Sequence, residues 1–583
     1  MRRCEERTFA AMDGAQLFYR HWPRIEGSGH SAVLLLHRGH EHSGRLQHLA
    51  DELNLPEHSL FAWDARGHGR SPGPRGCAPS FGALVKDLDT FVHHIRDQHG
   101  IAPENIAILS QSVGSVLAAT WVHDYAPKIR CMVLASPAFQ IKLYVPFARP
   151  VLKLLYKLRG DFTVKSYVKA HFLTHDQNRI REFEHDRLIT RDISVKVLLE
   201  LYDTAARIVA DAAVIETPTQ LLISGADWVV QKKTQLQFFQ RLGSSLKEKR
   251  ELKGFYHDTF GEKDRHLAVG KAREFVLDAF AEPVQQPSLL NADQSGATKD
   301  EYDRLRRPLW PIGPKTIIYG AMKSALKTGG RLSDGIRVGL EYGFDSGSSL
   351  DYVYRNQASG FTPLGKFVDW LYINSIGWRG IRVRKQHLQQ MIVRAIAELR
   401  TRGLPVNLVD AAAGHGRYVL DSIEPHAASV DHILLRDYSP LNVQKGSVLI
   451  GERRLPIPVR FEQGDAFDRR ALARIEPRPT LAVVSGLYEL FAENAPVRES
   501  LGGLADAISP CGYLVYTGQP WHPQLEFISR TLSSHRDHKP WIMRRRTQAE
   551  LDELVEAAGF RKVDQMIDNW GIFTVSLAQK VAA

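Results

Sequence analysis

Residues 107–114, with the sequence Ala-Ile-Leu-Ser-Gln-Ser-Val-Gly, predict a buried strand that ends in a sharp turn, with Ser112 at its apex. A serine held at a strand-to-helix junction presents its hydroxyl to a substrate without crowding from its own backbone. That hydroxyl becomes a nucleophile only when a neighbouring base removes its proton. The turn therefore constrains the whole chain, because it requires a base and an acid farther along the sequence.

Two later segments supply these groups. Residues 220–230 form an apolar run that carries Asp227, and residues 254–260 carry His257. A continuous apolar run is typical of a strand buried on both faces of a parallel sheet. Histidine can take the serine proton near pH 7, and a buried carboxylate fixes its tautomer. Taken singly, Asp227 is better explained as a helix cap and His257 as a surface loop residue; the order of all three residues after suitable strands favours catalysis.

The order Ser112, Asp227, His257 resembles that of the α/β-hydrolases. Residues 61–73 contain Asp-Ala-Arg-Gly-His-Gly-Arg-Ser, which resembles the D-x-R-G-x-G-x-S loop of monoacylglycerol lipases and lysophospholipases. The resemblance implies an α/β-hydrolase domain in which Ser112 is the nucleophile, His257 the base and Asp227 its orienting acid.

The loop at residues 34–45 lies where this fold places its oxyanion loop. The resemblance implies that the backbone N–H groups of Gly39 and Val113 bind the oxyanion. The sequence departs from the family at Ser110 and Arg38, where glycine is usual. Arg38 is therefore expected either to be tolerated, since the donors are backbone groups, or to narrow or charge the acyl site.

Three histidines in the same loop suggest a metal site at first sight. They are His37, His40 and His42. Zinc sites generally combine histidines with a carboxylate or cysteine ligand at a characteristic spacing, which this segment does not offer. No metal is expected.

A second strand-to-turn segment occurs at residues 406–418. Its turn is rich in small residues and would open a helix whose N-terminus faces a ligand. Small residues also simply permit close packing of a helix on a strand, so further landmarks are needed. The pattern D-x-A-x-G-x-G resembles motif I of the class I S-adenosylmethionine-dependent methyltransferases. The turn contains Asp410, Ala412, Gly414 and Gly416.

Three further segments match that family in the expected order. Asp437 ends a strand in a D-x-S-P sequence, Asp465 and Ala466 form a G-D-A turn, and Ser485 follows a fourth strand. The resemblance implies a Rossmann-like methyltransferase domain with S-adenosylmethionine as cofactor. Asp437 would bind the ribose and Asp465 the adenine amine, with Ala466 and Ser485 beside them.

The methyl acceptor site is expected near the carboxyl ends of the strands, where such sheets bind ligands. Tyr488, Glu489, Trp521, His522 and Trp570 follow predicted strands. Tyr488 and His522 are the candidate acceptor residues. His522 is interpreted either as a base that deprotonates the acceptor or as a loop histidine bonded to backbone.

The composition limits where the chain acts. The four cysteines have no pairing or metal spacing, no apolar run of about 18 residues occurs, and the N-terminus has no signal-peptide pattern. We expect a cytoplasmic protein, with peripheral contact at the inner face of the membrane as an option. The net charge of +11 favours an anionic partner. Dispersed basic residues and the lack of a binding module argue against nucleic acid.

The 583 residues predict more than one α/β domain. A hydrolase domain is expected at 1–281, with a helical lid at about 139–213. A polar linker at 282–300 is followed by a helical region at 301–400 and the methyltransferase core at 401–583. The lid segment 139–159 mixes apolar and basic residues, and so does segment 366–385. Each is interpreted either as a membrane-surface element or as an ordinary packed helix.

Together these features predict a bifunctional enzyme. One half would hydrolyse a lipid ester of the lysophospholipid or monoacylglycerol type, and the other would methylate an acceptor related to lipid. The alternatives are acyl transfer, or a non-catalytic hydrolase half that docks lipid for a methyltransferase of a small metabolite or RNA.

Overall fold

The computed structural model describes residues 2–145, 147–282 and 287–581, which form two compact units, Met1–Pro287 and Ser288–Ala583. Residues 283–286 of the predicted linker lie outside the described residues. The segment that follows is held on the second unit. The Leu289 N–H donates to Glu553 at 2.7 Å, and the Asn494 N–H donates to Asp293 at 2.8 Å.

The first unit is built on an eight-stranded sheet with the order β1-β2-β4-β3-β5-β6-β9-β10 among its described residues. β1, β2 and β4 pair antiparallel, and the strands from β4 onward are parallel. The central strands are buried along their whole length, as expected when helices cover both faces. The strands are β1 (Glu5–Ala10), β2 (Gln16–Trp22), β3 (Ala32–Leu36), β4 (Ser59–Trp63), β5 (Ile106–Gln111), β6 (Cys131–Ala135), β9 (Thr219–Ser224) and β10 (Lys247–Leu252).

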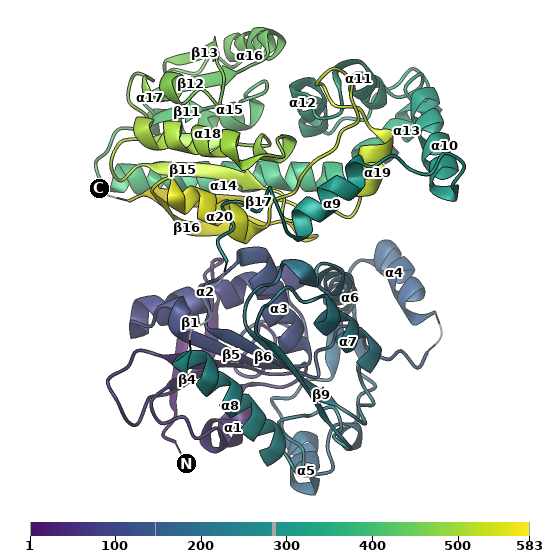
Figure 1. The fold of residues 1–583 in the computed structure, drawn as a ribbon, viewed down its shortest axis with the longest axis vertical. Helices are drawn as coiled ribbons and strands as arrows, with labels where there is room; N and C mark the ends of the chain where they lie inside the picture. Colours follow the sequence, from purple (N-terminus) through teal and green to yellow (C-terminus); the bar gives the residue numbers. More distant parts are fainter. Residues whose placement is uncertain (1, 146, 283–286, 582–583) are drawn as a thin grey trace. The chain divides into compact units, whose positions relative to one another are not determined.

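Helices cover both faces of this sheet (Figure 1). On one face α1 and α8 enclose a core with Val33, Leu35 and Ala107, while α2, α3 and α6 contact one another on the other face. This is the arrangement that the α/β-hydrolase resemblance predicts, and it leaves the carboxyl ends of the strands for the site. The helices are α1 (Gln47–Glu52), α2 (Phe81–His99), α3 (Val113–Tyr125), α6 (Val195–Ala210), α7 (Lys232–Arg241) and α8 (His266–Ala281).

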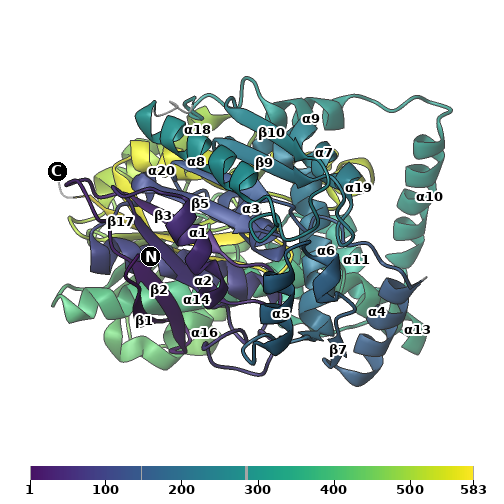
Figure 2. The ribbon, with the colours of Figure 1, turned by 90° about the horizontal axis from the view of Figure 1, so that it is seen from below.

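The predicted lid segment, of which residue 146 lies outside the described residues, consists of short elements between β6 and α6. They are α4 (Ala148–Arg159), β7 (Thr163–Lys165), α5 (Gln177–His185) and β8 (Asp192–Ser194). α4 has no buried residue, and Figure 2 shows it at the margin of its unit. Its exposed apolar side chains include Val151, Leu154 and Leu158.

The second unit has a seven-stranded sheet with the order β13-β12-β11-β14-β15-β17-β16 among its described residues. The first five strands in this order are parallel, and β17 lies antiparallel between β15 and β16. Strand order reverses between β11 and β14, which is where open α/β sheets bind ligands. The strands are β11 (Asn407–Asp410), β12 (His432–Asp437), β13 (Val459–Gln463), β14 (Leu481–Val484), β15 (Tyr513–Gly518), β16 (Phe560–Ile567) and β17 (Thr574–Lys580).

Helices precede and surround this sheet. The long helix α14 packs Leu388, Ile392 and Leu399 into the core with Val419 and Val483. None of the helices in the described part of either unit is long and apolar enough to cross a bilayer. The helices of the second unit are α9 (Ala297–Arg306), α10 (Pro314–Gly329), α11 (Asp334–Tyr342), α12 (Gly347–Arg355), α13 (Pro363–Ile373), α14 (Ile376–Thr401), α15 (Arg417–Ile423), α16 (Pro440–Arg453), α17 (Arg469–Ala473), α18 (Asn494–Ala507), α19 (Leu525–Thr531) and α20 (Gln548–Ala557).

Candidate active sites

Ser112 lies at the junction of β5 and α3 in a strained conformation. Its φ of 57° and ψ of −116° are values that non-glycine residues rarely adopt. The turn closes tightly enough that a Cβ at Gly114 would lie 2.6 Å from the carbonyl oxygen of His37. The predicted sharp turn is therefore present, with glycine where a side chain has no room.

The structure brings together the three predicted residues of the first site. His257 Nε2 lies 2.8 Å from Ser112 Oγ, and His257 Nδ1 lies 2.8 Å from Asp227 Oδ2. The N–H groups of Val229 and Val230 donate to the other Asp227 oxygen. Burial raises the pKa of the Asp227 carboxyl, but His257 and these two N–H groups outweigh burial and hold the pKa below its usual range. The carboxylate thus stays ionised beside the imidazole.

The predicted oxyanion donors also lie together. A Cβ built on Gly39 would come 3.2 Å from a methyl group of Val113, so the two residues are in contact range. Val113 is the first residue of α3, and an N–H in the first helical turn has no acceptor within its own helix. Both N–H groups can therefore serve an oxyanion next to Ser112.

The two departures from the family pattern have local explanations. Ser110 Oγ is buried and donates to the Val133 carbonyl oxygen at 3.0 Å, so a hydroxyl is accommodated in place of glycine. The Arg38 guanidinium donates to Glu41 at 2.8 Å and lies over the ring of Phe183 in α5. The ion pair with Glu41 therefore fixes Arg38 within the oxyanion loop, and the contact with Phe183 joins this loop to the lid segment.

The neighbouring histidines have separate structural partners. The Ala65 N–H donates to His37 Nε2 at 3.1 Å, so His37 Nδ1 carries the proton that it shares with the Arg38 carbonyl oxygen. His42 Nε2 lies 2.9 Å from Asp186, and burial lowers the pKa of His40 to about 4. Among the described residues no cluster of three potential ligands has a geometry suited to a metal ion.

A cavity of about 730 Å³ lies at the switch point of the second sheet. The turn after β11 forms one wall, and its glycines are required by the backbone. Gly414 and Gly416 have φ values of 59° and 74°, and a Cβ on Gly416 would come 2.4 Å from Leu435. Of the predicted cofactor residues, seven line the cavity. They are Ala412, Gly414, Gly416, Asp437, Asp465, Ala466 and Ser485.

Asp437 organises the edge of this cavity. Its carboxylate accepts from the N–H groups of Gly414 and Ser439, at 2.8 and 2.9 Å, and from Asn442. A carboxylate has about four lone-pair sites, so Asp437 can still accept from ribose hydroxyls. The buried Ser485 hydroxyl has no partner within the chain, and Asp465 is exposed at the rim. These groups fit the polar parts of a nucleoside cofactor.

Asp410 does not line the cavity, contrary to the role predicted for it. It is fully buried beneath the turn, where the Tyr418 hydroxyl and the Ala412 N–H donate to it. Burial raises the pKa of Asp410, and these two hydrogen bonds lower it by less. The resulting pKa is about 7. Asp410 therefore holds the shape of the turn from below.

This raised pKa predicts a pH-dependent stability. Because the folded state binds this proton more tightly, protonated Asp410 contributes to the stability of the fold. That contribution is complete below the unfolded pKa of about 4, and it is lost as pH rises through the folded pKa of about 7. Asp410→Asn imitates the protonated form, so its free energy of unfolding should exceed that of the parent by up to about 4 kcal/mol at pH 8 and match it near pH 4. Denaturant titrations at several pH values measure this difference. Asp506→Asn, at an exposed carboxylate of α18 in the same unit, is the control; a parallel pH dependence in Asp410→Asn and the parent would contradict the assignment.

The two predicted acceptor residues lie in different surroundings. Tyr488 is buried in the core, where its hydroxyl lies 3.1 Å from Ser500 in α18, so the prediction that it meets the acceptor is wrong. A tyrosine shortly after the end of β14 is expected to face the ligand, but the short helix Tyr488–Leu490 turns it inward. His522 does line a pocket, and its Nδ1 accepts from the Gln524 N–H at 3.0 Å.

That hydrogen bond limits what His522 can do. Because Nδ1 is the acceptor, the neutral ring carries its proton on Nε2 and has no free lone pair for a base. Burial lowers the pKa of His522 to about 3, so the ring stays neutral. The backbone-bonded interpretation is the one that the geometry favours.

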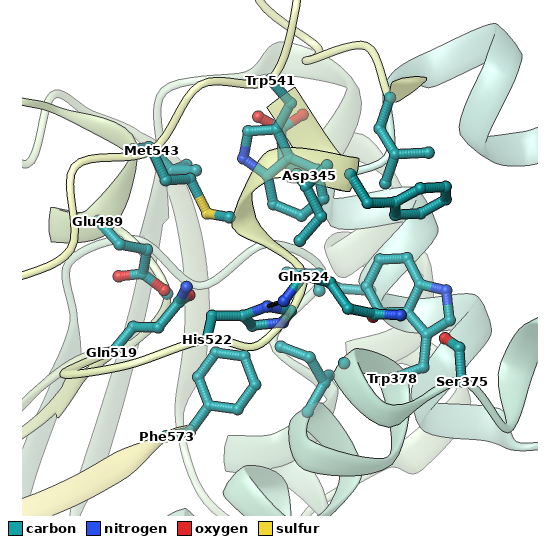
Figure 3. A pocket seen from close by; sticks show the side chains of 18 of the residues that line it. Asp345, Ser375, Trp378, Glu489, Gln519, His522, Gln524, Trp541, Met543 and Phe573 are labelled. Carbon is teal, nitrogen blue, oxygen red and sulfur yellow. Dashed lines mark hydrogen bonds between the residues drawn. The ribbon is translucent and has the colours of Figure 1, made fainter. Parts of the chain in front are cut away.

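This second pocket, of about 210 Å³, adjoins the cavity at the switch point and shares part of its lining. Glu489 and Trp378 face it, as do His522 and Phe573 (Figure 3). Arg384 and Gln519 also line it and were not among the predicted site residues. Gln519 follows β15 directly, so its place after a strand was an available signal, whereas Arg384 comes from α14 and reaches the site only through the fold. The residues in both linings are Asp345, Leu350, Arg384, Gly486 and Leu490.

The fold and the sites define a two-domain chain, an α/β-hydrolase unit followed by a methyltransferase unit. Residues 27–264 match the family described as "Serine aminopeptidase, S33". Residues 272–580, more than half of the chain, match the family described as "Putative methyltransferase", and the chain belongs to that family.

Several proteins resemble the chain over one or both units. "Uncharacterized protein YnbC" of Escherichia coli is 54% identical over 98% of both chains. "Phospholipase YtpA" of Bacillus subtilis is 25% identical over 42% of this chain and 95% of its own length. The crystal structure of Paleococcus ferrophilus monoacylglycerol lipase covers 45% of this chain and 99% of its own, at 24% identity and a TM-score of 0.41.

Proposed function

We propose that the chain is a bifunctional enzyme, a serine hydrolase of lipid esters joined to an S-adenosylmethionine-dependent methyltransferase. The hydrolase proposal depends chiefly on one observation, the hydrogen-bonded series from Ser112 through His257 to Asp227. The Bacillus subtilis phospholipase to which this half is similar supports a lipid ester as substrate.

In the proposed hydrolysis, Ser112 Oγ attacks the ester carbonyl carbon while His257 Nε2 takes the hydroxyl proton. Asp227 keeps the imidazole in the tautomer with the proton on Nδ1 and stabilises the imidazolium that forms. The N–H groups of Gly39 and Val113 bind the oxyanion. His257 then returns the proton to the leaving alcohol, and water repeats the sequence on the acyl-serine.

In the second unit, Gly414 and Gly416 would admit the amino-acid moiety of S-adenosylmethionine beside the turn, Asp437 would accept from the ribose, and Asp465 from the adenine amine. The cofactor supplies an electrophilic methyl group when bound. The chain's own residues position it and exclude water. Transfer of a labelled methyl group from S-adenosylmethionine into the lipid fraction of a bacterial extract would support the expected lipid-related acceptor.

A pair of measurements on the purified full chain tests both halves. A fluorophosphonate probe should label Ser112, and monooleoylglycerol should release fatty acid; without labelling, the hydrolase half is a lipid-docking module. Calorimetry should detect one site for S-adenosylhomocysteine. Absence of that binding would refute the methyltransferase half.

We also propose that α4 brings the hydrolase unit to anionic lipid surfaces. Its exposed apolar residues Leu154 and Leu158 alternate with Lys153 and Lys157, a pattern suited to the interface of a membrane with negative headgroups.

Leu154→Glu combined with Leu158→Glu should weaken binding to phosphatidylglycerol-containing vesicles by at least about tenfold, because two buried apolar contacts are lost. Vesicle sedimentation measures it. Leu267→Glu changes an exposed leucine of α8 in the same unit and should bind like the parent. Equal binding of all three proteins would exclude α4 as the contact.

A further inference from the structure

The pocket beside the cofactor cavity contains buried polar atoms that have no partner within the chain. They are Glu489 Oε2, Gln519 Nε2, Arg384 Nε and Trp541 Nε1. Glu489 and Gln519 are 8% and 3% exposed, and their side-chain ends point toward each other in Figure 3. A buried group without a hydrogen bond costs free energy, so such a group at a pocket wall indicates a ligand that satisfies it.

The unpartnered atoms include one acceptor and one donor that converge. The carboxylate oxygen of Glu489 can accept a proton-bearing group, and the Gln519 amide can donate to a lone pair. A hydroxyl is the smallest group that offers both. The polar end of the pocket therefore fits a ligand group, such as a hydroxyl, that donates to Glu489 and accepts from Gln519.

The charges around this end cancel. Arg384 Nη1 lies 3.3 Å from Glu489 Oε1, which makes a buried ion pair, and His522 is neutral. Asp345 accepts from the Ser534 hydroxyl and the His535 N–H, and the hydrogen bond from the His535 ring to Asp345 raises the pKa of His535, which favours the cation that neutralises Asp345. A charged ligand would be left uncompensated in this site, so the geometry favours a neutral one.

The remaining wall is apolar and aromatic. It is formed by Leu350, Tyr372, Trp378, Phe527, Met543 and Phe573. An apolar cavity of about 150 Å³ in another protein binds benzene. A pocket of about 210 Å³ thus accommodates a single ring with a small substituent.

The pocket and the cofactor cavity meet at Arg384 and Gly486. Gly486 has a φ of 70°, and a Cβ there would approach the Arg384 guanidinium to 3.1 Å. The absence of a Cβ at this position therefore leaves room for the guanidinium at the wall that the two spaces share. Glu489, three residues farther on, lines the pocket and not the cofactor cavity.

We infer that the methyl acceptor is a small neutral phenol-like molecule and that Glu489 is its base. This inference rests on the proposed methyltransferase function. The acceptor O–H bond would break as its proton passes to Glu489, and the oxygen would form a bond to the methyl carbon. The C–S bond to that carbon breaks, and S-adenosylhomocysteine leaves.

Binding is tested with 4-methylphenol on the full chain saturated with S-adenosylhomocysteine, by calorimetry and by fluorescence of the pocket tryptophans. We expect 4-methylphenol to bind at least about tenfold more tightly than toluene, because toluene leaves Glu489 and Gln519 without partners. Equal affinities, or binding only of benzoate, 4-methylaniline or monooleoylglycerol, would overturn the inference. Failure of S-adenosylhomocysteine itself to bind would instead refute the proposed function.

The role of Glu489 is tested by Glu489→Gln, which keeps the shape and removes the base. It should bind 4-methylphenol and S-adenosylhomocysteine within about threefold of the parent, yet transfer methyl groups at least about 100-fold more slowly. Tyr488→Phe, at the adjacent core position, should retain both binding and transfer. Unchanged transfer in Glu489→Gln, or loss of ligand binding together with transfer, would contradict a role as base.

Discussion

Ser112→Ala is expected to lower ester hydrolysis by roughly 10⁴-fold or more, because the whole triad acts through the serine oxygen. His257 and Asp227 would remain in place but would have no hydroxyl to activate. Hydrolysis of monooleoylglycerol, followed as fatty acid release, and fluorophosphonate labelling both measure this loss. S-adenosylhomocysteine binding should not change.

The matched control is Ser110→Ala, two residues earlier and within β5. Ser110 Oγ bonds to the Val133 carbonyl oxygen and to Ser115, within the sheet and its covering helix. Loss of this hydroxyl removes a neutral hydrogen bond worth about 1 kcal/mol of stability and removes no group of the triad. Hydrolysis should therefore stay within about threefold of the parent. More than a few per cent of activity in Ser112→Ala would eliminate Ser112 as the nucleophile.

Asp437→Ala is expected to weaken binding of S-adenosylhomocysteine by at least about 100-fold. The substitution removes the proposed ribose acceptor and also releases the N–H groups of Gly414 and Ser439, which the carboxylate holds at 2.8 and 2.9 Å. Two charge-assisted hydrogen bonds to a ligand together correspond to roughly 3 kcal/mol or more, which is at least about 100-fold in affinity. Calorimetry measures the dissociation constant directly.

Asp506→Ala serves as the control for that experiment. Asp506 lies on α18 in the same unit and forms an exposed ion pair with Arg469, away from the cavity lining. Its removal should leave the dissociation constant unchanged. An unchanged constant in Asp437→Ala as well would refute the cofactor assignment.

The sequence carried enough information to predict both folds and most of the first site. Apolar runs that end in Ser112 and before Asp227 are local signals of buried parallel strands, and turn glycines mark positions where a Cβ has no room. Because carboxyl ends of parallel strands gather at one edge of a sheet, residues far apart in the chain could be expected to meet.

Other features were decided by packing that no local pattern encodes. The position of Tyr488 depended on a one-turn helix that rotates it into the core, and Asp410 lies under its turn because Tyr418 closes over it. A residue's place after a strand identifies the edge of the sheet and leaves the direction of the side chain open.

The sequence by itself determined the two kinds of unit, their order, the series Ser112, Asp227, His257 and the glycine turn of the second sheet. Only the tertiary structure decided that Arg384, Glu489 and Gln519 share one pocket. The physical reason is that strand and turn signals arise between near neighbours in the chain. The lining of a pocket depends instead on how a separate helix, here α14, packs across the sheet.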